Sequence, residues 1–292
     1  MAFEGFQLSH IDVGDVTLRV RHGGSGPPLL LLHGCPQTHM MWGKIATDLA
    51  RDFTVVAPDL RGYGESSKPA PTPDNSAYSK RAMAGDAVAL MAHLGFPQFA
   101  VAGHDRGGRV AYRLALDHPE VVTRLSILDI IPTGEVWARA DHRFALGYWH
   151  WPFLAQPSPG PERAMAGDPE HFFFKFMFRG SPDTFEPEAY EDYLRCVGDP
   201  GVRRGICEDY RAGASFDRRL DQEQMGKVRI ACPVQVLWGG AGAVGAWYDV
   251  LGIWRGWADD VRGEAIDCGH FIPEEKPAET LAALRAFFAE GA

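Results

Sequence analysis

The sequence lacks the patterns that mark several large protein classes. Its 292 residues include only five cysteines, and no two of them form a CxxC pair, so neither a disulfide framework nor a zinc site is predicted. No apolar run is long enough to cross a bilayer. The first residues include acidic side chains and no basic segment followed by an apolar leader. We therefore expect reduced thiols, a cytoplasmic location and no membrane contact.

Positive charge is also scarce. The chain has 29 Lys and Arg against 38 Asp and Glu, a formal net charge of -9, which argues against nucleic acid as a partner because phosphate binding needs a basic surface. A few arginines in a pocket can still bind a small anion. The apolar content of 46% and charged content of 23% are those of an ordinary globular protein.

Buried strands and amphipathic helices alternate along most of the chain, which predicts an α/β fold with a parallel sheet covered on both faces. The expected strands lie in 16–22, 27–34, 53–66, 99–102, 122–130, 232–240 and 261–271, and the one in 53–66 runs into a glycine-rich loop. The expected helices include 78–94 and 275–290. From 133 to 222 the chain is instead rich in aromatic residues and arginine, with proline breaks. We expect a core domain of residues 1–132 and 223–292, a helical cap of residues 133–222, and a pocket at the carboxyl ends of the strands.

The stretch FAVAGHDRGGRVAYRLAL, residues 99–116, resembles the nucleophile turn of a serine hydrolase with one residue changed. A short apolar strand is followed by Gly103-x-Asp105-x-Gly107 and then by a helical pattern, and Asp105 stands where serine would stand. Asp105 could simply cap the helix. As a nucleophile, its carboxylate would attack an sp³ carbon, displace a leaving group and form an ester.

Two more residues follow the expected strands in the order of a catalytic triad. Asp129 ends the strand after the turn, and His270 follows the last strand. The other usual position for the acid carries Ala241-Gly242-Ala243, which favours Asp129 by elimination. His270, oriented by Asp129, would activate a water that hydrolyses the ester. The backbone N–H groups of Cys35 and Arg106 are the expected donors to the oxyanion.

Arg106 and Arg109 stand at the start of the helix that follows the turn. Because a cation there opposes the helix dipole, a solvated helix start explains them less well than a binding role. A guanidinium matches both oxygens of a carboxylate. We therefore expect these two arginines to bind a small anionic substrate next to the anionic nucleophile and to orient it for attack.

Motifs over nearly the whole chain resemble those of the haloacetate (fluoroacetate) dehalogenase family of the α/β-hydrolases. They are HGCPQTHMMW, DLRGYGESSKP, GHDRGGRVAYRLALDHP, LDIIPT, YWHWPFLAQP, CEDYRAGA and GHFIPEE. The resemblance implies an α/β-hydrolase fold, halide binding by His150, Trp151 and Tyr210, and a homodimer. Related haloalkane dehalogenases and epoxide hydrolases usually have Trp where this chain has Arg106.

Three functions remain in competition on the residues alone. Hydrolytic dehalogenation of a haloacetate to glycolate and halide, without metal or organic cofactor, uses all the motifs. Epoxide hydrolysis would use the same Asp105 with two cap tyrosines as acids, and would not need the two arginines. A non-catalytic small-molecule receptor is disfavoured because Asp105, Asp129 and His270 are all present. The sequence leaves the halogen open, since fluoroacetate and its chloro and bromo analogues share these requirements.

Overall fold

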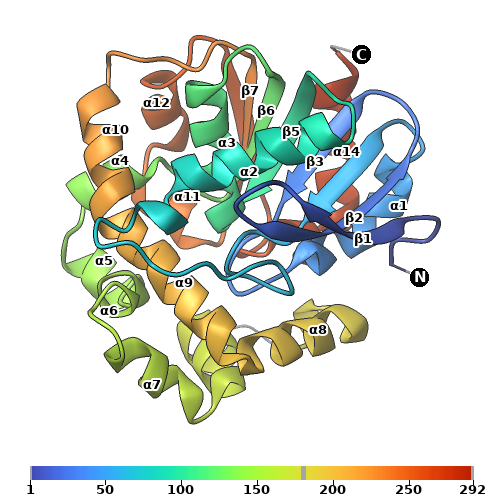
Figure 1. Cartoon of the computed structure of the whole chain (residues 1–292). Coiled ribbons are helices and arrows are strands. Elements are labelled where there is room, and N and C mark those ends of the chain that lie inside the picture. Colours follow the sequence, from blue (N-terminus) through green and yellow to red (C-terminus); the bar gives the residue numbers. More distant parts are fainter. Residues whose placement is uncertain (1, 179–181, 291–292) are drawn as a thin grey trace.

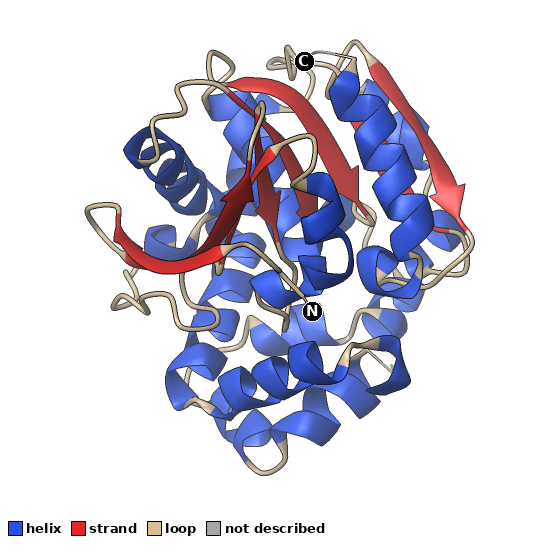
Figure 2. Ribbon diagram, turned by 90° about the vertical axis from the view of Figure 1, so that its right-hand side faces the viewer, coloured by secondary structure: helices blue, strands red, loops and turns tan. Residues whose placement is uncertain are grey.

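The computed structural model describes residues 2–178 and 182–290, and within them eight strands form one twisted sheet with helices on both sides (Figure 2). The strand order is β1-β2-β4-β3-β5-β6-β7-β8. The strands are β1 (Gln7–Asp12), β2 (Thr17–Gly24), β3 (Pro28–Leu32), β4 (Thr54–Pro58), β5 (Phe99–His104), β6 (Val122–Leu128), β7 (Val234–Gly239) and β8 (Val261–Ile266). In this order, all neighbouring strands from β4 to β8 are parallel. The pairs β1–β2 and β2–β4 are antiparallel. This confirms the predicted α/β-hydrolase class of fold.

The central strands are mostly apolar because both of their faces are covered. In β3 and β4 every residue after the first is buried, and in β5 every residue except the second is buried. All seven expected strands are present, although several are shorter than expected, and β4 ends at Pro58. The sequence analysis did not predict β1, an exposed edge strand that pairs only with β2.

Helices pack against both faces of the sheet. Those outside the segment between β6 and β7 are η1 (His39–Trp42), α1 (Gly43–Leu49), η2 (Ser76–Tyr78), α2 (Lys80–His93), α3 (Asp105–Asp117), α11 (Ala243–Trp247), α12 (Val250–Arg255), α13 (Ile272–Glu275) and α14 (Pro277–Ala289). The helix predicted for 275–290 is α14, and the short helix α13 precedes it. Among the described residues no helix combines the length and apolar character needed to cross a membrane.

The segment between β6 and β7 is helical. Its helices α5 to α9 gather beneath the sheet in the view of Figure 1. They are α4 (Thr133–Ala138), α5 (His142–Gly147), α6 (His150–Leu154), α7 (Gly160–Ala166), η3 (His171–Met177), η4 (Pro182–Thr184), α8 (Pro187–Gly198), α9 (Pro200–Ala212), η5 (Gly213–Asp217) and α10 (Arg218–Gln224). We refer to this segment as the cap.

Both ends of the cap are tied to α3, the helix that starts at Asp105. The buried carboxylate of Asp221 in α10 accepts a hydrogen bond from the Tyr112 hydroxyl of α3 at 2.7 Å. It also accepts one from the backbone N–H of Gly134 in α4 at 2.8 Å. The same side chain thus joins the entry and the exit of the cap to the helix that carries the candidate nucleophile.

The five cysteines are free thiols set in the interior. Cys35, Cys196, Cys207 and Cys268 are buried, and Cys232 is partly buried. Burial raises the pKa of every one of these thiols, in Cys232 to about 11 and in Cys196 and Cys268 to about 12. At neutral pH they are therefore protonated.

Candidate active site

The turn between β5 and α3 holds Asp105 in a left-handed backbone conformation with φ of 47°. Its two glycines are required by close backbone contacts. A Cβ on Gly103 would lie 2.5 Å from the carbonyl oxygen of Gly107, and a Cβ on Gly107 would lie 2.4 Å from that of Leu32. The tight turn brings the Asp105 carboxylate to the carboxyl ends of the strands, beneath the cap.

The structure brings Asp105, Asp129 and His270 together. Nδ1 of His270 lies 2.6 Å from Oδ2 of Asp129, and Nε2 of His270 lies 3.9 Å from Oδ2 of Asp105. Asp129 is itself fixed, because its Oδ1 accepts a hydrogen bond from the backbone N–H of Gly239 at 2.9 Å. A proton on Nδ1 shared with Asp129 leaves the Nε2 lone pair on the side of Asp105, and Nε2 is buried without a partner among the described residues.

The charges around these three residues keep the Asp105 carboxylate ionised. Burial by itself would raise the pKa of Asp105, but His270, His104 and the two arginines lower it to about 2. Burial would likewise lower the pKa of His270, but the hydrogen bond and charge of Asp129 and the charge of Asp105 raise it. A base of raised pKa oriented by a carboxylate suits the activation of water.

The loop after β3 supplies one of the two expected oxyanion donors directly. The backbone N–H of Cys35 donates to Oδ1 of Asp105 at 2.9 Å. Arg106 is the second residue of α3, where a backbone N–H has no acceptor within the helix. The Cys35 N–H thus adjoins the Asp105 carboxylate, on which an oxyanion would form, and the Arg106 N–H belongs to the next residue of the chain.

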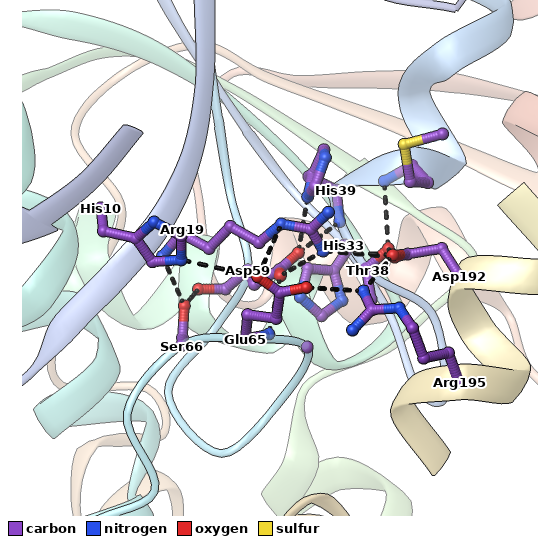
Figure 3. A network of polar contacts seen from close by, with 12 residues as sticks. His10, Arg19, His33, Thr38, His39, Asp59, Glu65, Ser66, Asp192 and Arg195 are labelled. Atoms are coloured by element: carbon purple, nitrogen blue, oxygen red, sulfur yellow. Dashed lines mark hydrogen bonds and ion pairs between the residues drawn. The ribbon is translucent and has the colours of Figure 1, made fainter. Parts of the chain in front are cut away.

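Side chains at both ends of this loop hold it in place (Figure 3). The backbone N–H of Leu60 donates to Nε2 of His33 at 2.9 Å, so Nδ1 carries the proton and donates to the Gly34 carbonyl at 2.8 Å. At the far end, the Thr38 hydroxyl donates to Asp192 of α8 at 2.6 Å. His33 thus serves as a structural support for the loop, and Thr38 connects the loop to the cap.

Arg106 and Arg109 are not a solvated helix start, because they are 0% and 3% exposed. Nη1 of Arg109 donates to the Ile131 carbonyl and to the Thr133 hydroxyl, both at 3.1 Å. Its Nε is buried without a partner among the described residues, and no described residue accepts from its Nη2. The Nε–Nη2 edge, which is the edge that binds a carboxylate with two hydrogen bonds, is therefore free in Arg109.

We expected both arginines to bind substrate through this edge, but in Arg106 the edge is occupied. Its Nε and Nη2 donate to the carboxylate of Asp209 in α9. Only Nη1 is left without a partner among the described residues, and that atom is buried. The sequence analysis quoted the CEDYRAGA motif but gave Asp209 no role.

The three residues expected to bind halide lie together in the cap. The ring centroid of Tyr210 in α9 is 5.9 Å from that of His150 and 6.0 Å from that of Trp151, both in α6. The guanidinium carbons of Arg106 and Arg109 lie 4.3 Å from the Tyr210 ring and 4.5 Å from the Trp151 ring, respectively. The arginines and the trio therefore form one cluster.

The polar atoms of this trio are available. No described residue accepts a hydrogen bond from the Trp151 indole or the Tyr210 hydroxyl, and Nδ1 of His150 is buried without a partner among them. Burial lowers the pKa of His150 to about 3, so its neutral ring has one N–H to donate. The charge of Asp105 raises the pKa of both His150 and Tyr210, which indicates that both side chains lie near Asp105.

Of the cap tyrosines that sequence could not orient, Tyr148 faces the site. Burial raises the pKa of its phenol well above the usual value, and the charge of Asp129 raises it further. Its ring stacks with that of Trp151 at a centroid distance of 6.2 Å. Tyr190 and Tyr193 have other partners, since their hydroxyls donate to Glu170 and Glu274 at 3.0 and 2.9 Å.

A buried acid next to the site, Glu274, was not among the predicted site residues. Its Oε1 accepts from the Tyr193 hydroxyl of the cap, and its Oε2 accepts from the amide of Gln37, in the loop that carries Cys35. It follows His270 by four residues. Glu274 therefore joins the cap, the loop after β3 and the segment that carries His270. Burial raises its pKa to about 8.

This raised pKa predicts that the fold loses stability as the pH rises from 4.5 to about 8. The folded state keeps a proton on Glu274 that the unfolded chain releases near its usual pKa of 4.5. The contribution is therefore complete below pH 4.5 and is lost as the pH rises through about 8, with a slope of up to about 1.4 kcal/mol per pH unit. Glu274→Gln should match the wild type in urea unfolding at pH 5 and exceed it at pH 8.5.

The exposed Glu279→Gln variant is the control, because its unfolding curve should follow that of the wild type at both pH values. If the Glu274→Gln and wild-type free energies of unfolding changed in parallel between pH 5 and 8.5, a proton held by Glu274 would be excluded.

Across residues 2–178 and 182–290, no group of three or more His, Cys, Asp and Glu side chains has an arrangement that could hold a metal ion.

Comparisons with known proteins identify the family and support the fold. A family model described as alpha/beta hydrolase fold matches residues 27–277. The chain is 44% identical over 291 residues to a fluoroacetate dehalogenase from Burkholderia sp., covering 99% of this chain and 95% of that protein. It is 37% identical over 275 residues to a soluble epoxide hydrolase from Corynebacterium sp. (strain C12), covering 91% of each. A crystal structure of a candidate α/β-hydrolase from Nostoc sp. PCC 7120 matches with a TM-score of 0.95 at 49% identity, over 98% of this chain and 99% of that one.

Proposed function

Because the chain belongs to the haloacetate dehalogenase family of the α/β-hydrolase superfamily, we propose that it hydrolyses a haloacetate to glycolate and halide through an ester on Asp105. The observation that carries the proposal is the set of unpaired guanidinium N–H groups beside an ionised carboxylate. Arg109 offers a free edge and Arg106 a free Nη1, so a small carboxylate has a receptor next to the nucleophile. A neutral substrate would leave these buried donors unsatisfied.

In the first step, an oxygen of Asp105 attacks the α-carbon of the substrate. A carbon–oxygen bond forms while the carbon–halogen bond breaks, and the halide leaves with the bonding electron pair. Binding of the substrate carboxylate by Arg106 and Arg109 offsets the repulsion between two anions and aligns the carbon for in-line attack. The N–H groups of His150 and Trp151 and the hydroxyl of Tyr210 donate hydrogen bonds to the departing halide.

In the second step, water attacks the carbonyl carbon of the ester. Nε2 of His270 removes a proton from the water, and Asp129 stabilises the imidazolium that results. The backbone N–H groups of Cys35 and Arg106 stabilise the oxyanion on the former Asp105 carboxylate. When the intermediate collapses, the bond between the Asp105 carbonyl carbon and the glycolate oxygen breaks, and glycolate leaves with the proton from His270.

Epoxide hydrolysis by the same ester mechanism is the second candidate. Two tyrosines near Asp105, Tyr148 and Tyr210, support it, because phenols can protonate an opening epoxide. A relative from Corynebacterium is named as a soluble epoxide hydrolase. Against it, an epoxide carries no carboxylate and would use neither Arg106 nor Arg109.

A substrate panel decides between the two candidates. Halide release should be detected with at least one of fluoro-, chloro- and bromoacetate, and the same series identifies the halogen range. 2-Chloropropionate tests whether a methyl group on the α-carbon is tolerated. Turnover of styrene oxide without halide release from any of the acids would replace dehalogenation with epoxide hydrolysis.

Arg109→Met should weaken use of the anionic substrate selectively. Losing the free edge leaves one arginine to bind the carboxylate, so kcat/KM for chloroacetate should fall by about two orders of magnitude. The loss should be much smaller for 2-chloroacetamide, which has the same carbon–chlorine bond and no charge. Steady-state halide release with both substrates measures the difference.

The matched control is Arg81→Met, which removes a surface guanidinium paired with Asp117 and should change neither value. An equal loss on the two substrates in Arg109→Met would show that Arg109 supports the fold of the site without binding the carboxylate.

A further inference from the structure

One edge of the Arg106 guanidinium is held by Asp209, a residue of the cap helix α9. Nε of Arg106 donates to Oδ2 at 2.9 Å, and Nη2 donates to Oδ1 at 2.5 Å and to the main-chain oxygen of Asp209 at 2.9 Å. Both side chains are fully buried. Two parallel hydrogen bonds to one carboxylate fix both the plane of a guanidinium and its rotation within that plane.

The Asp209 carboxylate has two further donors. Lys80 of α2 contacts Oδ1, and the Tyr63 hydroxyl donates to Oδ2 at 2.7 Å. Burial by itself would raise the pKa of Asp209, but Arg106 and Lys80 lower it well below its usual value. Each oxygen thus accepts from two donors, and the carboxylate cannot turn away without leaving buried donors unpaired.

The same helix covers one face of Arg106. Tyr210 directly follows Asp209, and its ring centroid lies 4.3 Å from the guanidinium carbon. The guanidinium therefore has its edge set by Asp209 and its face set by Tyr210. Of its three nitrogens, only Nη1 has no partner among the described residues.

We propose that Asp209 is the positioning residue for Arg106. It holds the Nε–Nη2 edge, so that Nη1 of Arg106 binds the substrate carboxylate. The inference rests on the proposed function. Arg106 then supplies one donating end and Arg109 a full edge, so the two together fix the rotation of the bound acid. Asp209 also competes with Asp105 for Arg106. The described ion pairs of Arg106 include Asp209 and not Asp105, which leaves the nucleophile free to attack.

The chain offers a matched pair of variants to test this. Asp209→Asn removes the charge that holds Arg106. Asp217→Asn removes a second buried carboxylate next to Lys80. Asp217 accepts a hydrogen bond from the Lys80 backbone N–H at 2.9 Å and lies 3.7 Å from its Nζ, and it shares no hydrogen bond or ion pair with Arg106 among the described residues. Both changes keep the side-chain shape and take one anion from the same lysine.

The measurement is the ratio of kcat/KM for chloroacetate to that for 2-chloroacetamide, with acetate as a competitive inhibitor. Asp209→Asn should lower the ratio by at least about tenfold, through a raised KM for chloroacetate, and should weaken acetate inhibition by a similar factor. Asp217→Asn should leave both quantities as in the wild type. An unchanged ratio in Asp209→Asn, or an equal loss on the two substrates, would overturn the inference.

If Asp209→Asn does not fold by circular dichroism, Tyr63→Phe decides. It removes one donor from Asp209 and should lower the ratio several-fold, and an unchanged ratio would overturn the inference. Failure of the proposed function has a different signature, since the wild type itself would then release no halide from any haloacetate. A wild type that is active on haloacetate, with variants that keep its ratio, contradicts the role of Asp209 alone.

Discussion

Asp105→Asn should abolish halide release, with kcat for chloroacetate lowered by at least about four orders of magnitude. A neutral amide cannot displace halide from a saturated carbon at a useful rate, so the first step has no nucleophile. Asparagine is the best replacement for this test because it tolerates the left-handed conformation that residue 105 adopts, with φ of 47°. Steady-state halide release measures the loss.

The variant should remain folded and bind substrate. Its side-chain oxygen can still accept the Cys35 backbone N–H, as Oδ1 of Asp105 does. The thermal midpoint should stay within a few degrees of the wild type, and acetate should bind at least as tightly once the competing negative charge is gone. Halide release within tenfold of the wild-type rate would mean that the nucleophile lies elsewhere.

His270→Asn should separate the two steps and trap the ester. Attack by Asp105 does not need the imidazole, whereas hydrolysis needs Nε2 to take a proton from water. We expect a burst of one halide per active site and then a turnover rate lower by about three orders of magnitude. Intact-protein and peptide mass spectrometry should find a carboxymethyl group on Asp105 after incubation with bromoacetate.

Two controls make the result specific. The double variant Asp105→Asn, His270→Asn should give neither a burst nor the adduct. In the wild type, a single turnover in heavy-oxygen water should label residue 105, and the first glycolate formed should carry an unlabelled hydroxyl oxygen. A first glycolate bearing the solvent label, with residue 105 unlabelled, would mean that water attacks the substrate directly and that no ester forms.

The sequence predicted the parts of the fold that depend on local pattern. Strands β3, β4 and β5 are buried on both faces, so their apolar runs stand out in the chain. The edge strand β1 has mixed polarity and owes its conformation to pairing with β2, so nothing in residues 7–12 alone marks it. The helical cap could be recognised from its composition, but the order and bounds of its short helices depend on packing.

The site divides in the same way. Asp105, Asp129 and His270 could be proposed because chain order and strand ends bring such residues together in parallel sheets. The occupied edge of Arg106 could not be predicted, because its partner Asp209 is more than a hundred residues away in the sequence. The buried Glu274 is a similar case, since its partners Gln37 and Tyr193 come from distant segments.

The protonated interior cysteines have a consequence for an enzyme of this proposed specificity. Haloacetates alkylate ionised thiols, so a catalyst that concentrates them in a buried site risks inactivating itself. The backbone of Cys35 contacts Asp105, and its thiol is buried. Burial keeps this thiol protonated, as it keeps the other four. Under the proposed mechanism, the electrophile would react with a carboxylate, whose ester water can cleave, and not with sulfur, whose thioether would be permanent.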